Sequence, residues 1–307
     1  MRRRYAYTRR CCGARTARWT RTTEATFFYL PVWVGALLWH SGWDNVSELQ
    51  DLIRAAYRYC QYRYPKHAAW KEGGPRNHIM AFTHDVGPIL FPDDLPRNQF
   101  LTVGSQDTND IVLPPCCARL LTWRSRELLA LSNSSWIAAP KRVDIFFQGA
   151  RESGFRGQFV DHYAEWLRNG SWPSSVRTRA DCGRECFAQS VFCFTPPGFD
   201  GVSWTGRDSG AVLAGCIPVH YNKSWPFDRF IWWSAISLNA GAEDEQALAS
   251  TPALVTDALR NASWVRNAQL GLQQLWPAMT IVPSWERRTR PNLVDTLTLL
   301  VAELAHR

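Results

Sequence analysis

A proline- and glycine-rich segment between two apolar runs carries the residue types best suited to bind a phosphate group. The apolar run 190–195 leads into Pro196-Pro197-Gly198, and a following run of small residues is typical of a closely packed helix. Ser203 or Thr205 can cap that helix, whose free N–H groups favour an anion. Arg207 falls in the first helical turn, where a cation opposes the helix dipole unless it grips a phosphate in bidentate fashion. The alternative is an exposed arginine on a glycine-rich loop.

His84 and Asp85 are the candidates for acid–base chemistry. They directly follow the apolar run 78–83, which is expected to be a buried strand, so both lie at the end of that strand. An imidazole or a carboxylate in this position could take the proton from a hydroxyl group. A neighbouring His–Asp pair also occurs in purely structural settings, and this alternative stays open.

The nine cysteines do not have the spacing of a zinc site. Cys182, Cys186 and Cys193 form no CxxC pair and have no nearby histidine pair, so we expect no bound metal. A disulfide involving Cys182 or Cys186 is expected if the protein is lumenal. Cys193 and Cys216 lie in apolar runs and are expected to be buried thiols.

Sequons favour a lumenal protein. Chance gives about one or two Asn-X-Ser sites in a chain of this composition, whereas this chain has them at Asn45, Asn133, Asn169, Asn222 and Asn261. The longest apolar stretch, 27–39, contains a proline and is too short to span a bilayer, and no signal peptide is visible at the start. We therefore expect a lumenal protein whose N-terminal anchor is not present in this sequence.

Short apolar runs alternate with helical patterns along the chain. Strands are expected at 26–32, 78–83, 110–115, 143–149, 190–195 and 216–220, and helices at 47–64, up to Trp166, 209–215, 251–259 and 293–305. Residues 169–180 look like a loop. This alternation predicts an α/β fold with parallel sheets covered by helices on both faces. A new strand–helix series begins after a hinge between 114 and 141.

The composition excludes several classes of protein. With 307 residues, of which 46% are hydrophobic, the chain can bury a large core, so it is neither disordered nor a coiled coil. Residues 1–21 hold eight arginines and no acid, and the rest of the chain has 27 basic and 27 acidic residues. A basic arm can touch nucleic acid or anionic lipid, but the neutral body gives no reason to expect a nucleic-acid partner.

The segment around Arg207 resembles the exostosin family of glycosyltransferases. The residues that carry the resemblance are, in order, Ser190–Gly198, Ser203-Trp204, Arg207, Ala211, Gly215–Val219 and Pro226-Phe227. Weaker matches occur at Ala25–Pro31, Trp70, Gly73-Gly74, Arg76–His78, His84-Asp85, Asp110–Pro114, Phe146–Gly149 and Arg156. The resemblance covers about residues 22–240.

This resemblance implies a GT-B fold, in which two Rossmann-like domains face a cleft. The implied domains are a basic arm (1–21), an acceptor-side Rossmann-like domain (22–130) and a nucleotide-sugar-binding Rossmann-like domain with C-terminal helices (131–307). The N-terminal domain lacks the family's first strand and helix and is expected to be incomplete. Members of the family act on the lumenal side of the Golgi membrane.

The resemblance also implies a reaction. The family inverts the anomeric centre as it moves a sugar from a nucleotide diphosphate sugar to a polysaccharide or glycoprotein glycan, with no cofactor beyond the donor and no metal. His84 and Asp85 are then the catalytic candidates, and the donor-binding candidates are Gly149, Arg156, Gly198, Ser203, Trp204, Arg207, Gly210 and Pro218. Some tryptophans could form acceptor subsites, although most tryptophans fill cores; those near the site are Trp204, Trp225, Trp232 and Trp233.

Two departures from the family pattern leave other functions open. Gly210 stands where the family has an acid that may hold the donor ribose, and Asn77 stands where it has an aspartate. The second hypothesis is therefore a non-catalytic carbohydrate-binding or scaffolding subunit, which could form a hetero-oligomer with a related transferase. The third is a basic nucleotide-binding protein outside the secretory pathway.

Overall fold

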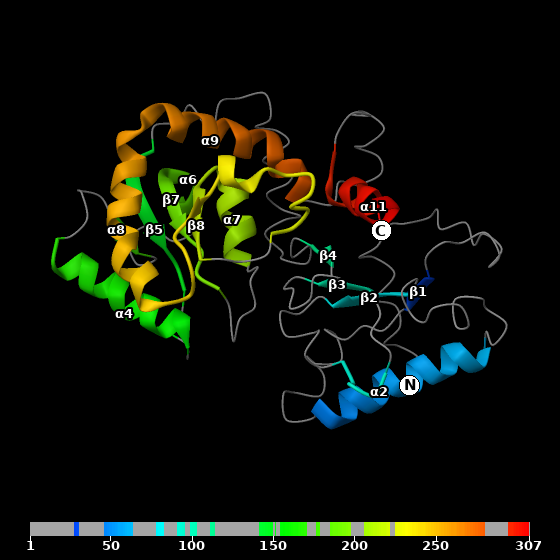
Figure 1. Cartoon of the computed structure of the whole chain (residues 1–307). Coiled ribbons are helices and arrows are strands. Elements are labelled where there is room, and N and C mark those ends of the chain that lie inside the picture. Colours follow the sequence, from blue (N-terminus) through cyan, green and yellow to red (C-terminus); the bar gives the residue numbers. More distant parts are fainter. Residues whose placement is uncertain are drawn as a thin grey trace.

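The chain forms two parallel β-sheets, each with its own helices (Figure 1). The computed structural model describes residues 28–30, 46–63, 78–82, 91–95, 99–102, 111–113, 141–149, 151, 154–170, 176–178, 185–197, 206–221, 225–279 and 294–306. The expected α/β fold with two parallel sheets is confirmed.

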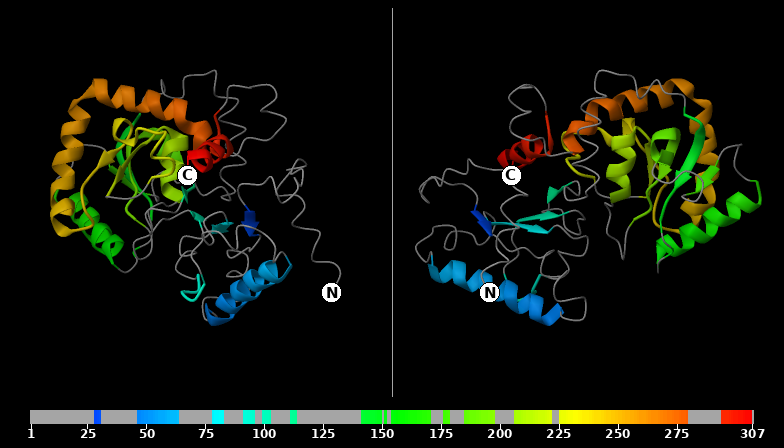
Figure 2. Two further views of the ribbon diagram at one scale, coloured as in Figure 1. Left: turned by 45° about the vertical axis from the view of Figure 1, so that its right-hand side comes forward. Right: turned by 180° about the vertical axis from the view of Figure 1, so that it is seen from behind.

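The first sheet has the strand order β1-β2-β3-β4, with every neighbouring pair parallel. Its strands are β1 (Phe28–Leu30), β2 (His78–Phe82), β3 (Gln99–Thr102) and β4 (Ile111–Val112). Helix α2 (Val46–Arg63) lies below this sheet in all views (Figures 1 and 2). Its buried residues Leu49, Ile53 and Tyr57 recur every four positions, which puts them on one helical face.

The second sheet has the order β6-β5-β7-β8-β9 and is also parallel throughout. Its strands are β6 (Val176–Thr178), β5 (Val143–Phe147), β7 (Ser190–Phe194), β8 (Ile217–His220) and β9 (Leu238–Asn239). The helices of this half are α4 (Phe155–Arg168), α6 (Glu185–Gln189), α7 (Gly206–Ala214), α8 (Glu245–Arg260), α9 (Ala262–Leu275) and α11 (Thr296–His306). Two 3-10 turns, η7 (Trp233–Ala235) and η8 (Trp276–Met279), complete it.

The core of the second sheet has two faces because successive strand residues point to opposite sides. Phe147 of β5 packs edge-on against Phe159 and Tyr163 of α4, with ring centroids 4.9 and 5.5 Å apart. The preceding residue, Phe146, packs against Phe187 of α6 at 4.9 Å. Helix α4 therefore covers one face, while α6 and α7 cover the other.

Most of the expected elements are present, with some corrections. The helix expected at 47–64 spans 46–63, and the helix expected at 251–259 is part of the longer α8. The loop expected at 169–180 is wrong in part, because 176–178 form the edge strand β6 that pairs with β5. The sequence patterns missed the short strands β3 and β9 and the helices α6 and α9. The boundaries of the two domains stay a prediction.

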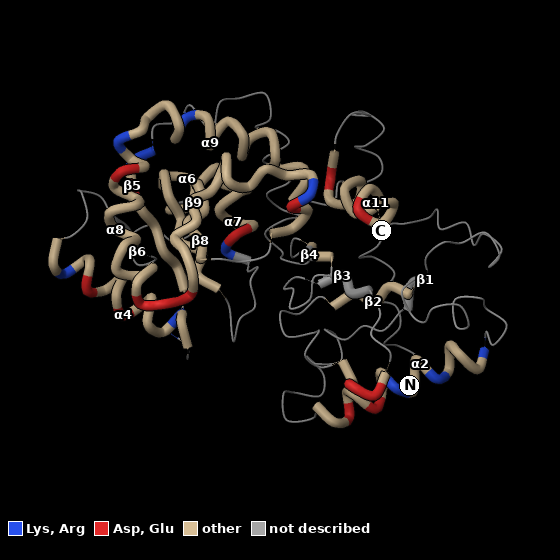
Figure 3. The backbone as a smooth tube through the Cα atoms, in the orientation of Figure 1, with Lys and Arg blue, Asp and Glu red and all other residues tan. Residues whose placement is uncertain are grey.

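Charged residues in the described part are spread over several helices. Figure 3 shows Lys and Arg on α2, α4, α8 and α9, and Asp and Glu on α2, α4 and α8. In that same part, no helix combines the length and hydrophobicity needed to cross a bilayer.

Candidate functional site

The candidate site lies at the carboxyl ends of β5 and β7, where the chain enters α7. Ligands of parallel α/β sheets bind at this edge, because the strands end there and helices begin. β5 ends before Gly149, and β7 ends before Thr195, Pro196 and Pro197, all three of which are buried.

Arg207 lies in the first turn of α7 and is half-buried. Its Nη2 donates a hydrogen bond to the carbonyl oxygen of Pro196 at 3.1 Å. A Cβ placed on Gly149 would lie 3.2 Å from Arg207 Nη1 and only 2.7 Å from Cζ of Phe147. Glycine at position 149 therefore leaves the space that the guanidinium occupies.

Arg156, which is 8% exposed, approaches the same edge from α4. Its Nε donates a hydrogen bond to the carbonyl oxygen of Pro197 at 3.2 Å. Two guanidinium groups from different helices thus bind consecutive carbonyl groups at the end of β7. The structure brings together three of the residues expected from the sequence, Gly149, Arg156 and Arg207.

One carboxylate belongs to the electrostatics of this edge. Asp208 follows Arg207 in the first turn of α7 and is fully buried. An acid in this position is favourable for the helix dipole.

Gly210 follows Arg207 by three positions in α7, whereas Pro218 lies in β8. A Cβ on Gly210 would meet the Phe187 ring of α6 at 3.7 and 3.8 Å, which is ordinary contact, so a Cβ fits there. Pro218 lies inside β8, opposite Cys193 of β7, and is buried within the sheet rather than at its carboxyl edge. Nothing in this placement brings Pro218 to a donor.

Several expected site residues lie outside the described part of the chain. These are the catalytic candidates His84 and Asp85, the donor-binding candidates Gly198, Ser203 and Trp204, and the sequon residues Asn45, Asn133 and Asn222. The other two sequon asparagines are exposed, Asn169 just after α4 and Asn261 between α8 and α9.

The tryptophans near the site divide into two groups. Trp225 and Trp233 are buried and stack on one another, with ring centroids 4.2 Å apart. Trp232, which lies between them in the sequence, is 80% exposed. Two residues that sequence reasoning did not single out end β8: His220, whose Nε2 lies 3.3 Å from Ser237 Oγ, and Tyr221, whose hydroxyl lies 3.1 Å from Thr251 Oγ1. Both are buried, and only their position at the strand end could have indicated them.

The rear of α7 is fixed by a C-terminal cap. Gly215 has φ +64°, and the N–H groups of Gly215 and Cys216 donate to the carbonyls of Val212 and Ala211 at 3.1 and 2.9 Å. This is the Schellman arrangement, in which a left-handed glycine closes a helix. The cap turns the chain directly from α7 into β8.

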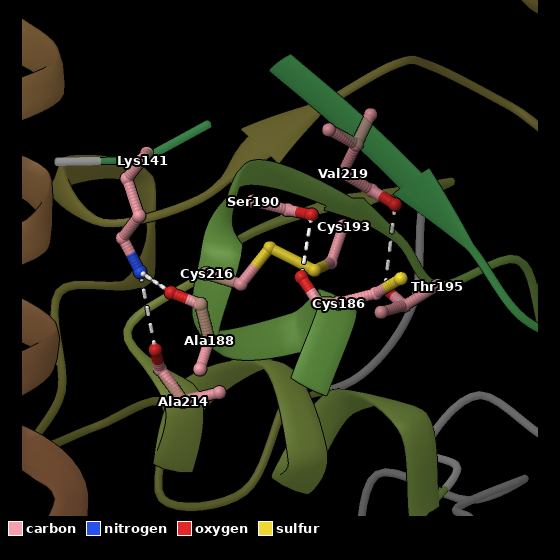
Figure 4. Close-up of a disulfide and its surroundings, with 9 residues drawn as sticks. All are labelled: Lys141, Cys186, Ala188, Ser190, Cys193, Thr195, Ala214, Cys216 and Val219. Carbon is pink, nitrogen blue, oxygen red and sulfur yellow. Dashed lines mark hydrogen bonds between the residues drawn. A yellow bond between two sulfur atoms is a disulfide. The ribbon is translucent and has the colours of Figure 1, made fainter. Parts of the chain in front are cut away.

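A disulfide joins Cys193 to Cys216 next to this cap (Figure 4). The expectation that both are buried thiols is wrong: both are fully buried, but they are bonded to each other. The parallel pairing of Phe192 with Ile217 brings the two cysteines together, with Cα atoms 5.7 Å apart. Cys186 is disulfide-bonded as well, which agrees with the expectation of a disulfide at Cys182 or Cys186.

Lys141 connects the ends of α6 and α7 on the same side of the sheet. Its Nζ donates to the carbonyls of Ala188 and Ala214 at 2.8 and 3.3 Å (Figure 4). Burial lowers the pKa of Lys141 to about 8. The cap, the disulfide and Lys141 fix the C-terminal end of α7. They therefore help to fix the position of Arg207 in the first turn of the same helix.

No group of three or more His, Cys, Asp or Glu residues that could hold a metal ion occurs among the described residues. The chemistry supported by the described geometry is the binding of an anion by guanidinium groups at a strand–helix junction.

Comparisons with known proteins identify a family and several similar proteins. The family described as "Exostosin GT47 domain" matches residues 12–253, a range that takes in every strand of both sheets. A protein of Oryza sativa subsp. japonica named as a probable glucuronosyltransferase is 22% identical over an alignment of 276 residues, which covers 83% of this chain and 62% of the relative. The chain thus spans less than two thirds of that relative's length.

Two solved structures are similar at low identity. WaaG, a glycosyltransferase involved in lipopolysaccharide biosynthesis, matches with 16% identity and a TM-score of 0.34, over 80% of this chain and 70% of its own. The GtfA/B complex matches with 11% identity and a TM-score of 0.34, over 70% of this chain and 43% of its own.

Proposed function

The chain belongs to the exostosin GT47 family of glycosyltransferases, and we propose that it moves a sugar, with inversion, from a nucleotide diphosphate sugar to a polysaccharide or glycoprotein glycan. The observation that carries this proposal is the pair Arg156 and Arg207. They bind consecutive carbonyls at the carboxyl end of β7, beside a glycine that leaves room for the guanidinium. A departing nucleoside diphosphate needs positive charge at such a place.

The reaction assigns a task to each group. The acceptor hydroxyl oxygen attacks the anomeric carbon, and the bond from that carbon to the diphosphate oxygen breaks. The leaving diphosphate keeps the electron pair, and the guanidinium groups of Arg156 and Arg207 offset its charge. A base takes the hydroxyl proton, and His84 and Asp85 remain the candidates for it. We expect the diphosphate to need no metal, since cationic side chains and the α7 N-terminus take that role.

The name of the rice relative suggests the first donor to test. Because that protein is named as a probable glucuronosyltransferase, UDP-glucuronate comes first, with neutral UDP-hexoses and UDP-pentoses beside it. The acceptor and the linkage are open, and a polysaccharide is the class that we favour.

We place the reaction on the lumenal side of the Golgi membrane. The Cys193–Cys216 disulfide supports this location, because disulfides persist in oxidising compartments and are rare in the cytosol. The five sequons support it as well.

A second candidate is a non-catalytic subunit that binds the donor or a glycan and assists a related transferase. Gly210 favours it, since glycine offers the donor ribose no acceptor at this position. Such a subunit would bind ligands and transfer nothing.

The test is thermal stabilisation by a panel of nucleotide sugars, followed by an assay of hydrolysis and transfer. A ligand at a hundred times its Kd adds about 2.7 kcal/mol to the stability of the folded protein. We expect stabilisation of the native chain and of Arg260→Ala, whose arginine is exposed on α8 and pairs with Asp257. Arg207→Ala should lose it. Absence of stabilisation by every nucleotide contradicts the proposal, and binding without turnover favours the second candidate.

A further inference from the structure

Helix α2 presents an apolar stripe to solvent, on the side away from its buried residues. Leu52, Tyr59 and Tyr62 are large side chains that are 44%, 63% and 82% exposed. With Ala55, which is also exposed, they recur at intervals of three and four residues. This spacing puts the four residues along one side of the helix, as in helices that pair with another helix. An exposed apolar stripe of this kind commonly marks an interaction surface.

The charges on the exposed side of α2 are divided between its two ends. Glu48 and Asp51 lie toward the N-terminus, Arg58 and Arg63 lie toward the C-terminus, and all four are exposed (Figure 3). Asp51 also accepts a hydrogen bond from Arg54 at 2.9 Å, yet its side chain remains 73% exposed. The exposed side of α2 therefore has an acidic end, an apolar centre and a basic end.

A second copy of the same helix, running in the opposite direction, matches this distribution of charge. When the two copies cross with Ala55 facing Ala55, residues at about equal distances on either side of this position lie next to each other. Asp51 then lies beside the partner's Arg58, and Leu52 lies beside the partner's Tyr59. The two-fold symmetry makes each of these contacts occur twice. Ala55 has the smallest side chain of the stripe, so the two backbones can approach closely where they cross.

The charges favour a second copy over other occupants of this face. An anionic glycan or an anionic membrane could bind Arg58 and Arg63, but Glu48 and Asp51 on the same side of the helix would repel it. A protein interface, by contrast, has an apolar centre and a polar rim, which is the arrangement found on α2. Because the face is complementary to itself, a second copy of the chain is the partner that its charges fit.

We propose that α2 is a dimerisation surface, on which a second copy of this chain packs its own α2 in the antiparallel direction. One pair of helices makes a small interface, so we expect a reversible dimer with a Kd of about 10 μM. The inference stands apart from the proposed function, because no residue of the donor edge takes part in the interface.

Sedimentation velocity of the full chain, at concentrations from well below to well above about 10 μM, measures the dimer. Arg58→Glu should weaken dimerisation about tenfold or more, because the new carboxylate lies beside the partner's Asp51. Asp51→Arg should weaken it similarly by placing two guanidinium groups together. Arg260→Glu is the matched control, since it makes the same change of charge at an exposed arginine of α8. It should dimerise as the native chain does.

Mixing the two single variants tests the pairing itself. In a dimer of one Arg58→Glu chain with one Asp51→Arg chain, every carboxylate at these two positions lies beside an arginine. The mixture should therefore form dimers with near-native affinity, although each variant alone does not. The double variant Asp51→Arg with Arg58→Glu should also dimerise, because it exchanges the charges at the two ends. Circular dichroism shows whether each variant is folded.

Weaker dimerisation of each single variant, with recovery in the mixture, supports the inference. It is overturned if the native chain stays monomeric at the highest concentration, if Arg58→Glu dimerises as tightly as the native chain, or if the mixture stays monomeric. A monomeric native chain that sediments with vesicles of phosphatidylcholine and phosphatidylserine would assign the face to a membrane surface, and this result too overturns the inference. Nucleotide binding is a separate measurement and counts for or against the proposed function alone.

Discussion

At the scale of single side chains, the position of the Arg207 guanidinium depends on two neighbouring residues. Gly149 leaves the space for its guanidinium, and the Pro196 carbonyl orients that group. The planar fork of an arginine can then bind two oxygens of one phosphate, which an ammonium group cannot do in the same geometry.

Arg207→Lys should therefore weaken the binding of UDP by about 1–2 kcal/mol, because it keeps the charge and loses the fork. Calorimetric titration with UDP measures this, with circular dichroism to show that the variant is folded. A folded Arg207→Ala protein with native affinity for every nucleotide would show that Arg207 does not bind the diphosphate.

Gly210 allows a test in which a substitution is expected to tighten the binding of a nucleotide sugar. Gly210→Glu should tighten the binding of a nucleotide sugar by about tenfold or more, because a charged hydrogen bond to a ribose hydroxyl contributes about 1.5–3 kcal/mol. The Phe187 ring would lie 3.7 Å from the new Cβ, which is ordinary van der Waals contact.

Gly210→Ala is the matched control for Gly210→Glu. Both substitutions remove a glycine from a helix and stabilise it by up to about 1 kcal/mol, but only glutamate offers an acceptor. If the two variants bind nucleotide sugars equally well, the ribose is held elsewhere.

Among the helices and strands, the unit β7–α7–β8 is held together by more than its sheet. The disulfide joins two cysteines that are 23 positions apart in the sequence, Cys193 and Cys216. By loop entropy, a closure of this size contributes about 3 kcal/mol to the free energy of unfolding.

The double variant Cys193→Ala with Cys216→Ala should lose roughly that amount of stability. Urea unfolding followed by tryptophan fluorescence measures it, and Cys60→Ala, which removes a cysteine that forms no disulfide, is the control. Equal stability of the double variant and the native chain would show that the bond adds no constraint.

Lys141 gives the same unit a dependence on pH. Its folded pKa is lowered to about 8 from an ordinary value of 10.5, so between these pH values the unfolded chain binds more protons at this site. The contribution of Lys141 to stability therefore rises as the pH increases from about 8 to 10.5.

The native chain should thus gain stability relative to Lys141→Met as the pH is raised from 7 to 9.5. Urea unfolding at several pH values measures the difference. A difference that stays flat would mean that the two carbonyl bonds, from the negative ends of α6 and α7, keep the lysine charged.

The elements that the sequence predicts well are those with a local pattern. The apolar spacing of α2 places its ends within a residue, and the apolar runs of β2, β5 and β7 mark buried strands. β3 and β9 have no such pattern, because each becomes a strand only by pairing with β2 or β8.

In the candidate site, too, the residues of a local motif can be predicted from the sequence, whereas contacts between distant residues cannot. The motif around Arg207 indicates its chemistry, but Gly149 is 58 positions earlier, and only the sheet shows that the two are in contact. The bond between Cys193 and Cys216 follows from the parallel register of β7 and β8, which composition does not reveal.

In the molecule as a whole, the two sheets share part of one buried core. Ile79 and Ile111 of the first sheet belong to the same apolar cluster as Leu299 of α11 and the centre of the second sheet. Helix α11 also contacts Phe230 through His306, with ring centroids 5.7 Å apart. The C-terminal helix therefore contributes to the link between the two halves.

Glycosylation tests where this molecule resides. A secreted form should shift in mobility after peptide-N-glycosidase treatment, because Asn169 and Asn261 are exposed sequon residues. Asn261 also caps α9 by accepting from Trp264 N at 3.1 Å, so Asn261→Asp should keep the cap and lose only the glycan. An unshifted band, with all five asparagines unmodified, would argue for a cytosolic protein.

The bond between Cys193 and Cys216 also decides what a protease can do to this molecule. Arg207 and all of α7 lie inside a covalent ring, since both precede Cys216 and follow Cys193 in the chain. A single cut after Arg207 would break the polypeptide and still leave the two pieces joined. The nicked protein would migrate as one species without reductant and as two with it, so intact mobility under oxidising conditions is no proof of an intact backbone.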